Sequence, residues 1–178
     1  MVLAFKMLCN GDARVVSPLS KVWKILKTIH LGTGLKTADD FGKAVKSALM
    51  KIDDRANDIL DKSAFTVAQV ETEVELACAT VKELTGKNMA TLRDIFDAIR
   101  CIGDLCPAEA GPQLRLQYTD QPKGERLVIA MEPITDSDGG LRLFSVEHCG
   151  DGPWLSADFG DPDGVWSGFY RFVFLRRK

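Results

Sequence analysis

The segment Cys106-Pro-Ala-Glu-Ala-Gly-Pro112 divides the 178-residue chain into two parts whose apolar residues recur at different spacings. Its small residues, its glycine and its prolines are typical of a connection between structural units. Before it, apolar residues recur every three or four positions, as in amphipathic helices, and after it they tend to recur at every second position, as in strands. We therefore predict a helical region over 1–106, a linker over 107–112 and a β region over 113–178, either as separate units or as one continuous domain.

Two of four predicted helices lie before residue 62. The first spans about 17–30, where Pro18 suits the first turn of a helix. The second spans about 37–61, because the Thr37 hydroxyl can accept the amide of Asp40 and so cap the helix. Apolar residues recur at helical spacing along both stretches, which predicts amphipathic helices packed on a common core.

The most regular pattern in the chain follows, over about 66–85. Its apolar residues alternate spacings of three and four positions without a break: Val67, Val70, Val74, Ala77, Val81 and Leu84. Such a narrow seam is typical of a helix that packs along another helix. Gly86 is predicted to end this helix, and Asn88 to cap a fourth that extends to about Ile102. The second and third helices then form an antiparallel hairpin with two shorter partners.

Five strands are predicted after the linker, over 114–118, 127–131, 141–146, 153–159 and 165–176. Short turns rich in Asp, Gly and Pro separate most of them and leave no room for crossover helices, so we expect an antiparallel meander of four or five strands. The last strand is apolar on both faces, which predicts a position inside the sheet. The predicted fold class is therefore α+β, with an N-terminal helical hairpin or bundle packed against a C-terminal antiparallel sheet.

Charge and cysteine content restrict the setting in which the chain acts. Lys plus Arg number 23 and Asp plus Glu 25, so the net charge of −2 provides no overall positive field for nucleic acid. No apolar stretch approaches the roughly 20 residues that cross a bilayer. The apolar start of the chain is interrupted by Lys6 and is too short for a signal-peptide core. Five irregularly spaced cysteines favour reduced thiols, and we therefore expect a cytoplasmic protein.

Residues suited to catalysis or metal binding are few. Histidine occurs only at positions 30 and 148. His148 stands beside Cys149, but neighbours on a strand point to opposite faces, so the imidazole is poorly placed to deprotonate the thiol. Cys101 and Cys106 could join them as ligands, yet the spacing matches no familiar zinc pattern. We therefore predict no catalytic residue, no metal and no cofactor.

Protein binding is the function that the sequence favours. Three large aromatic residues stand beside turns or on the strand that is apolar on both faces: Trp154, Trp166 and Phe169. Aromatic side chains near a surface commonly anchor protein interfaces, although the same residues could complete the core. We predict a non-enzymatic interaction or adaptor module that binds a protein partner or a second copy of itself.

Two other functions remain open. The stretch 66–103 has the order helix, glycine turn, helix of a nucleic-acid-binding helix-turn-helix unit. Its second helix would present Lys87, Asn88, Thr91 and Arg93 to a DNA groove. A small enzyme is the other alternative, using Cys149 or the aspartates that turns could gather at one end of the sheet: Asp151, Asp158, Asp161 and Asp163.

Overall fold

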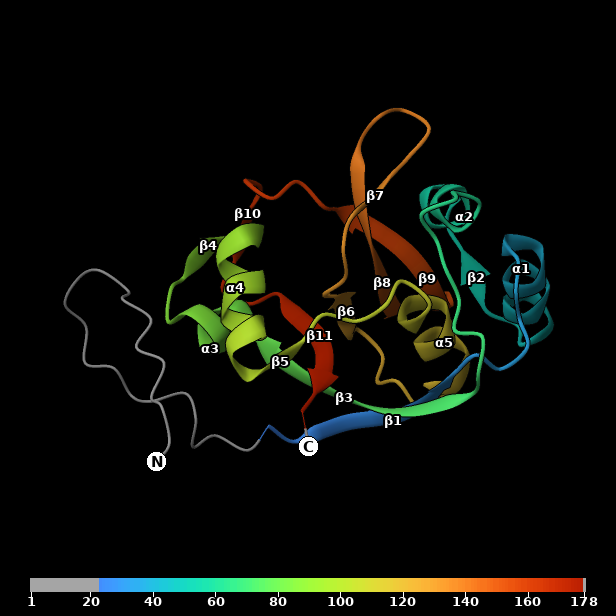
Figure 1. Cartoon of the computed structure of the whole chain (residues 1–178), viewed down its shortest axis with the longest axis horizontal. Coiled ribbons are helices and arrows are strands. Elements are labelled where there is room, and N and C mark those ends of the chain that lie inside the picture. The colour runs from blue at the N-terminus through green and yellow to red at the C-terminus, as the bar shows by residue number, and fades with distance from the viewer. Residues whose placement is uncertain (1–22, 178) are drawn as a thin grey trace.

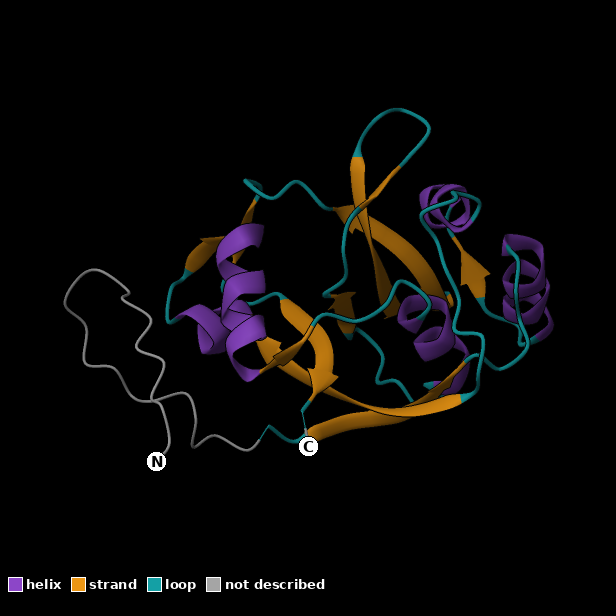
Figure 2. Ribbon diagram, in the orientation of Figure 1, coloured by secondary structure: helices purple, strands orange, loops and turns teal. Residues whose placement is uncertain are grey.

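Residues 23–177, which the computed structural model describes, form a curled mixed sheet of nine strands, a separate two-stranded sheet and five helices (Figure 1). The strands, orange in Figure 2, are β1 (Ile25–Leu31), β2 (Lys51–Ile52), β3 (Thr72–Thr80), β4 (Met89–Thr91), β5 (Gly103–Asp104), β6 (Arg126–Ile129), β7 (Ile134–Thr135), β8 (Leu141–Cys149), β9 (Gly152–Phe159), β10 (Val165–Ser167) and β11 (Arg171–Arg176). The helices are α1 (Ala38–Ser47), α2 (Asp54–Leu60), α3 (Val81–Thr85), α4 (Leu92–Ile102) and α5 (Ala110–Gln117).

The large sheet joins strands from both sides of the predicted linker. Its order is β1-β3-β11-β6-β8-β9-β2, with β5 paired to β11 and β7 to β8. Most neighbours are antiparallel, but β6 runs parallel to β11 and β2 runs parallel to β9. β4 and β10 form the small sheet. Strands from before and after 107–112 are therefore hydrogen-bonded into one layer.

The predicted fold class is wrong in its N-terminal helical bundle and in its simple meander. The structure is mostly β, and the large sheet is mixed. Two parts of the strand prediction are confirmed. β6, β8 and β9 pair antiparallel in succession, and β11 lies between β3 and β6, inside the sheet. The central residues of β11, 172–174, are fully buried, as expected for a strand that is apolar on both faces.

The stretch predicted as the third helix instead forms β3 followed by the short helix α3. Val67 and Val70 precede the strand, Val74 and Ala77 lie on it, and Val81 begins the helix. The residues with this regular spacing therefore lie in a loop, in a strand and in a helix, and not in one helix. β-Branched residues favour the extended chain, and a partner strand on each side stabilises it by hydrogen bonds.

The first two predicted helices are also corrected. Strand β1 occupies the C-terminal half of the predicted helix 17–30, and the residues of that helix before 23 lie outside the described part of the chain. The second is divided into α1 and α2 by a turn at Leu49, whose φ is 58°, and by β2. The predicted cap is confirmed: the Thr37 hydroxyl accepts the Asp40 amide at 3.1 Å, and the Asp40 carboxylate accepts the Thr37 amide at 3.0 Å.

The fourth predicted helix is close to the observed α4. Its apolar face is buried at Leu92, Ile95, Phe96 and Ile99. The helix begins later than predicted, because Thr91 and not Asn88 caps it, with the Thr91 hydroxyl accepting the Asp94 amide at 3.2 Å. Gly86 ends α3 in the left-handed conformation, with φ of 73°. None of the helices in residues 23–177 is long and apolar enough to cross a membrane.

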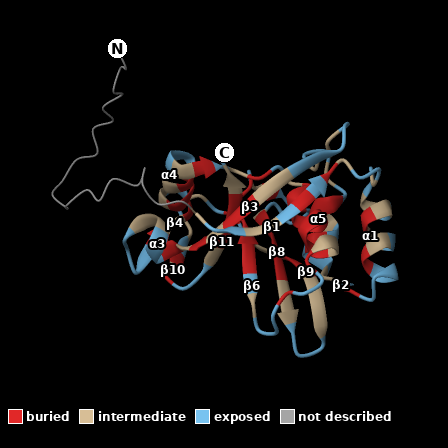
Figure 3. Cartoon of the chain, turned by 90° about the horizontal axis from the view of Figure 1, so that it is seen from below, coloured by how far each residue is buried: buried red, intermediate tan, exposed pale blue. Residues whose placement is uncertain are grey.

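Helix α5 lies in the interior and not between two units. It begins inside the predicted linker and continues to Gln117, so the strand predicted over 114–118 is wrong. Residues 110–115 are all buried, and Figure 3 shows α5 lying against the sheet. The close approach depends on Gly111, where an added Cβ would lie 2.6 Å from the Cβ of Phe144 on β8. A residue that looks like a chain breaker therefore permits close packing.

Gly111→Ala should destabilise the protein by about 1–3 kcal/mol, because the methyl group overpacks the contact with Phe144. This loss exceeds the roughly 1 kcal/mol that alanine gains over glycine inside a helix. Gly42 in α1 is the matched control, because nothing lies within 4 Å of a Cβ added there. Gly42→Ala should stabilise the protein. Urea denaturation measures the free energy of unfolding of both variants. If the two substitutions changed it equally and in the same direction, the close packing at Gly111 would be contradicted.

Candidate functional site

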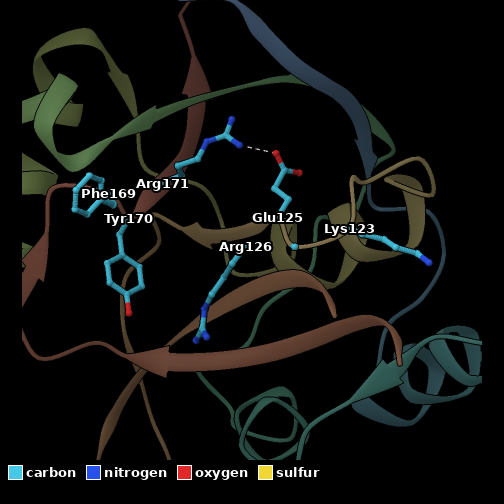
Figure 4. A pocket seen from close by; sticks show the side chains of 7 residues that line it. Lys123, Glu125, Arg126, Phe169, Tyr170 and Arg171 are labelled. Carbon is cyan, nitrogen blue, oxygen red and sulfur yellow. Dashed lines mark hydrogen bonds and ion pairs between the residues drawn. The ribbon is translucent and has the colours of Figure 1, made fainter. Parts of the chain in front are cut away.

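An open hollow of about 480 Å³ lies beside the turn that joins β10 to β11 (Figure 4). Its lining comes from two segments distant in sequence: Lys123, Gly124, Glu125, Arg126, Phe169, Tyr170 and Arg171. The segments meet because β6 and β11 are adjacent and parallel, so that their N-terminal ends lie side by side. The topology of the sheet therefore creates this first hollow.

A second hollow, of about 390 Å³, adjoins the first across Tyr170, which lines both. It is lined by Asp158, Phe159, Asp161, Gly164, Val165, Trp166 and Tyr170. Residues 160–164 form the turn between β9 and β10, and this turn brings apolar residues on its two sides into one hollow. The two hollows thus form one surface.

We call the apolar residues of the two hollows the aromatic surface: Phe159, Val165, Trp166, Phe169 and Tyr170. Phe169 is 89% exposed, Phe159 67% and Val165 59%. Single exposed apolar residues are common on soluble proteins, but neighbouring large ones mark sites of interaction. The aromatic surface is therefore the candidate functional site.

Backbone hydrogen bonds hold the turn that presents Phe169. The Gly168 amide donates to the Asn88 carbonyl at 2.6 Å, and the Gly168 carbonyl accepts the Lys82 amide at 3.2 Å. The Tyr170 amide closes the turn by donating to the Ser167 carbonyl at 3.1 Å. The Tyr170 carbonyl also accepts the Val81 amide at 2.9 Å, so the backbone on both sides of Phe169 is bonded to α3, and Gly168 also to Asn88 just before β4.

Trp166 connects the aromatic surface to the core. It is 8% exposed, and its ring meets the rings of Tyr170 and Phe172 edge-on, with centroids 4.9 and 5.0 Å apart. Edge-to-face packing of this kind stabilises aromatic pairs. Tyr170 is 40% exposed, so one ring of the stack reaches solvent. The surface therefore has a rigid base.

The arginines of the first hollow pair with carboxylates inside the protein. Arg171 donates to Glu125 at 2.5 Å. Arg126 donates to Asp158, with an Nε–Oδ2 distance of 3.3 Å, and its Nη1 lies 3.6 Å from the Glu147 carboxylate. Although partial burial acts in the opposite direction, Asp158 raises the pKa of Arg126. Both guanidinium charges are thus already compensated, which disfavours an anionic ligand here.

Cys78 and Tyr118, which lie near Arg171 and Glu125, are not activated nucleophiles. Burial raises the pKa of the Cys78 thiol to about 11, against the opposing charge of Arg171. Burial and then the charge of Glu125 raise the pKa of Tyr118 to about 12. Both groups therefore remain protonated at neutral pH. Within residues 23–177, no group of three or more His, Cys, Asp or Glu side chains could hold a metal ion.

The structure separates the three aromatic residues predicted as interaction anchors. Phe169 and Trp166 belong to the aromatic surface, the first exposed and the second buried beneath it. Trp154 lies near the other end of β9. Its indole N–H donates to Asp151 at 3.0 Å, and the Lys51 ammonium lies 5.1 Å from its ring centroid. Trp154 is therefore engaged away from the two hollows.

Sequence reasoning missed Phe159, Val165 and Tyr170. Phe159 and Val165 flank the turn over 160–164, and this position is the signal that could have placed them together. The sequence predicts a continuous strand through Tyr170, whereas the turn that separates β10 from β11 brings this residue to the surface.

The residues of the nucleic-acid alternative lie around β4 and the start of α4. They are Lys87, Asn88, Thr91 and Arg93. Lys87 pairs with Asp94 at 2.8 Å, and Arg93 pairs with Asp163 at 2.9 Å. Thr91 caps α4, and the Asn88 carbonyl accepts the Gly168 amide. The first helix of this alternative, predicted over about 66–85, is β3 followed by the short helix α3 in the structure.

The residues of the enzyme alternative do not form one cluster. Three of its aspartates pair with basic residues: Asp151 with Lys51, Asp158 with Arg126 and Asp163 with Arg93. Asp161 accepts the Asp163 amide at 2.9 Å. Partial burial and then nearby carboxylates raise the pKa of Cys149, which disfavours its thiolate. Its neighbour His148 bonds through Nδ1 to the Gln121 carbonyl at 2.6 Å.

The two remaining cysteines considered as metal ligands differ in environment. Cys101 is exposed, whereas Cys106 is buried and its thiol donates to the Val173 carbonyl at 3.6 Å. Burial raises the pKa of the Cys106 thiol. A buried, protonated thiol is a structural group and not a metal ligand.

Comparison with protein-family models, with curated proteins and with solved structures gives no match.

Proposed function

We propose that the chain is a cytoplasmic, non-enzymatic protein-interaction module that binds its partner through the aromatic surface. The observation that carries this proposal is Phe169, which is 89% exposed on a turn whose backbone is hydrogen-bonded on both sides. A large apolar side chain held in water by a rigid turn gains free energy when a partner covers it. Fully burying a phenylalanine is worth about 1.5–3 kcal/mol.

The surroundings of Phe169 favour an apolar contact. Arg126 and Arg171 already bond to carboxylates of the chain, so the groups left without a partner are mainly aromatic rings. The two hollows contain no histidine, cysteine or serine in their lining. Rigid aromatic side chains are typical of the energetic centre of a protein interface.

Photo-crosslinking in cells tests this proposal. Position 169 would carry the photoreactive phenylalanine analogue p-benzoylphenylalanine, which resembles the native side chain. The matched control carries the same group at Leu49, which is 90% exposed in the turn between α1 and β2. We expect discrete protein adducts from position 169 and none from position 49. Equal labelling at both positions, or no protein adduct from position 169, would overturn the proposal.

A further inference from the structure

We propose that the partner protein contributes an extended segment, which pairs with the free edge of β9 beside the aromatic surface and runs parallel to this strand. The inference rests on the proposed function, since it states which kind of segment the partner of that surface presents. Its basis is a set of backbone groups at the end of β9 that have no hydrogen-bond partner in residues 23–177.

Strand β9 is paired along its whole length on one edge only. β8 pairs with all eight of its residues, whereas β2 pairs with Trp154 and Leu155 alone. Figure 1 shows β2 beside one end of β9. After Ile52 the chain leaves the sheet, because Asp53 caps helix α2. The last part of β9 therefore has a neighbouring strand on one side and none on the other.

The neighbouring hydrogen bonds show which backbone groups face this free edge. The Gly160 amide donates to the Leu141 carbonyl of β8 at 2.7 Å, so the even-numbered residues of β9 bond to β8 and the odd-numbered ones face the opposite edge. On that edge the Leu155 carbonyl accepts the Asp53 amide at 3.0 Å. The backbone groups of residues 157 and 159 therefore point in the same direction, beyond β2.

The Asp53 carboxylate occupies only the first of these positions, where it accepts the Ala157 amide at 3.1 Å. The next three groups along the edge are the Ala157 carbonyl, the Phe159 amide and the Phe159 carbonyl. Within the part of the chain that the structure describes, none of the three forms a hydrogen bond. Unpaired groups in a row at the edge of a sheet are a template for an extended chain.

A parallel segment satisfies all three groups. In a parallel pair, one residue donates to a carbonyl of the neighbouring strand and accepts the amide two positions further on. One residue of the partner would thus bond to the Ala157 carbonyl and the Phe159 amide, and its second neighbour to the Phe159 carbonyl. This register continues the parallel pairing that β2 begins. An antiparallel segment would instead direct a carbonyl at the Ala157 amide, which Asp53 already occupies.

The side chain of Phe159 gives the free edge an apolar contact. Phe159 is 67% exposed, and the guanidinium of Arg142 lies 4.7 Å from its ring centroid, so the ring is held in place next to the edge. In strand addition, main-chain hydrogen bonds provide affinity and side-chain contacts provide specificity. We therefore expect the partner residue in register with Phe159 to be apolar.

Hydrogen exchange tests the pairing. The partner identified by its adduct with position 169 is added to the full chain, and exchange of the backbone amides is followed by NMR. The Phe159 amide should exchange about tenfold more slowly, or slower still, in the complex. The Ala157 amide is the matched control, because it is already bonded to Asp53 and should change little. A complex in which the Phe159 amide exchanges as in the free chain would overturn the inference and leave the proposed function in place.

Two variants separate the Phe159 amide from its ring. Phe159→Ala and Phe159→Pro both remove the ring, but only proline removes the N–H, and proline is tolerated on an edge strand where the N–H faces outward. The dissociation constant of Phe159→Pro should exceed that of Phe159→Ala by about tenfold. Phenyllactic acid at position 159, which keeps the ring and replaces the N–H by oxygen, should weaken binding by a similar factor. Unfolding midpoints in urea establish that each variant is folded, and equal dissociation constants for the alanine and proline variants would overturn the inference.

Photo-crosslinking determines the direction of the segment. p-Benzoylphenylalanine is placed at position 159 and, separately, at position 161 in the turn that follows β9. Both should form adducts with one stretch of the partner, and the adduct from position 161 should lie closer to the partner's C-terminus. The opposite order would overturn the parallel arrangement. The absence of any protein adduct from position 169 would overturn the proposed function and this inference together.

Discussion

Arg115→Ala should lower the free energy of unfolding by about 3–5 kcal/mol, because it leaves buried acceptors without donors, at about 1–3 kcal/mol each, and creates a cavity where the side chain was. Arg115 lies on α5 and is completely buried. Its Nη1 donates to the Gln121 side chain at 2.5 Å and to the Glu147 carbonyl at 3.3 Å, and its Nη2 donates to the Tyr118 carbonyl at 2.7 Å. Urea denaturation followed by circular dichroism measures the loss.

The network explains why the guanidinium is retained although no carboxylate neutralises it. Burial lowers the pKa of Arg115 to about 10, so the group is still charged at neutral pH. Gln121, which Arg115 orients, donates in turn to the carbonyls of Glu125 and Val146. Arg115 therefore fastens the segment between α5 and β6 to β8. That segment includes Lys123 and Glu125, which line the first hollow. Arg115 therefore also helps to position this part of the hollow's lining.

Two substitutions test this role of Arg115. Arg115→Met keeps most of the side-chain volume but leaves the acceptors without donors. It should therefore still lower the free energy of unfolding by about 2–3 kcal/mol, since each buried group left unsatisfied costs about 1–3 kcal/mol. Arg55→Ala, at an exposed position on α2, is the control and should change stability by less than about 0.5 kcal/mol. A methionine variant as stable as the wild type would show that the hydrogen bonds contribute nothing.

The same helix shows why the sequence predicts a strand over 114–118, where the structure has α5. Apolar and polar residues alternate over 113–118, and alternation predicts a strand when the polar side chains face water. In α5, Gln113 and Arg115 are buried together with Leu114 between them. Their polar groups bond to other protein groups, so the polar residues mark an internal network and not a solvated face. Periodicity alone cannot distinguish these two uses of a polar side chain.

Local signals were more reliable than long patterns. The capping residue Thr37 and the stop at Gly86 act through backbone bonds within a few residues, and both are confirmed. The seam over 67–84 depends on which partners cover it, and those partners are β1 and β11, strands distant in sequence. Because tertiary pairing overrides helical spacing there, the sequence could not reveal the strand.

The candidate site could be predicted only in part, because contacts between residues distant in sequence decide which aromatic side chains are exposed. Phe169 stands beside a glycine in a turn-rich region, and its aromatic type alone suggested an interface. Trp154 offers the same signal, but it is only partly exposed: Lys51 of the neighbouring strand β2 lies over its ring, and its indole N–H donates to Asp151 in the preceding turn. Which aromatic residue remains exposed is decided by the fold.

Glu109→Ala should have an effect as large as that of Arg115→Ala, with a loss of about 3–5 kcal/mol, because it leaves three buried or partly buried donors without an acceptor, at about 1–3 kcal/mol each. Glu109 is 1% exposed at the start of α5. Its Oε1 accepts the Gly32 amide at 2.7 Å and the Gln113 side-chain amide at 2.9 Å, and its Oε2 accepts the Ala68 amide at 2.7 Å. The carboxylate thus fastens the segments that follow β1 and precede β3 to the helix.

Glu109→Gln distinguishes these hydrogen bonds from simple packing, because glutamine has nearly the same shape. Its single carbonyl oxygen can replace one carboxylate oxygen, but its NH₂ group must then face either the Ala68 amide or the Gly32 amide, donor against donor. We therefore expect a loss of about 1–3 kcal/mol from a substitution that removes no volume. The control Glu132→Gln, at a side chain 78% exposed, should change stability by less than about 0.5 kcal/mol. If Glu109→Gln were equally neutral, the buried carboxylate would not hold α5 to the chain around it.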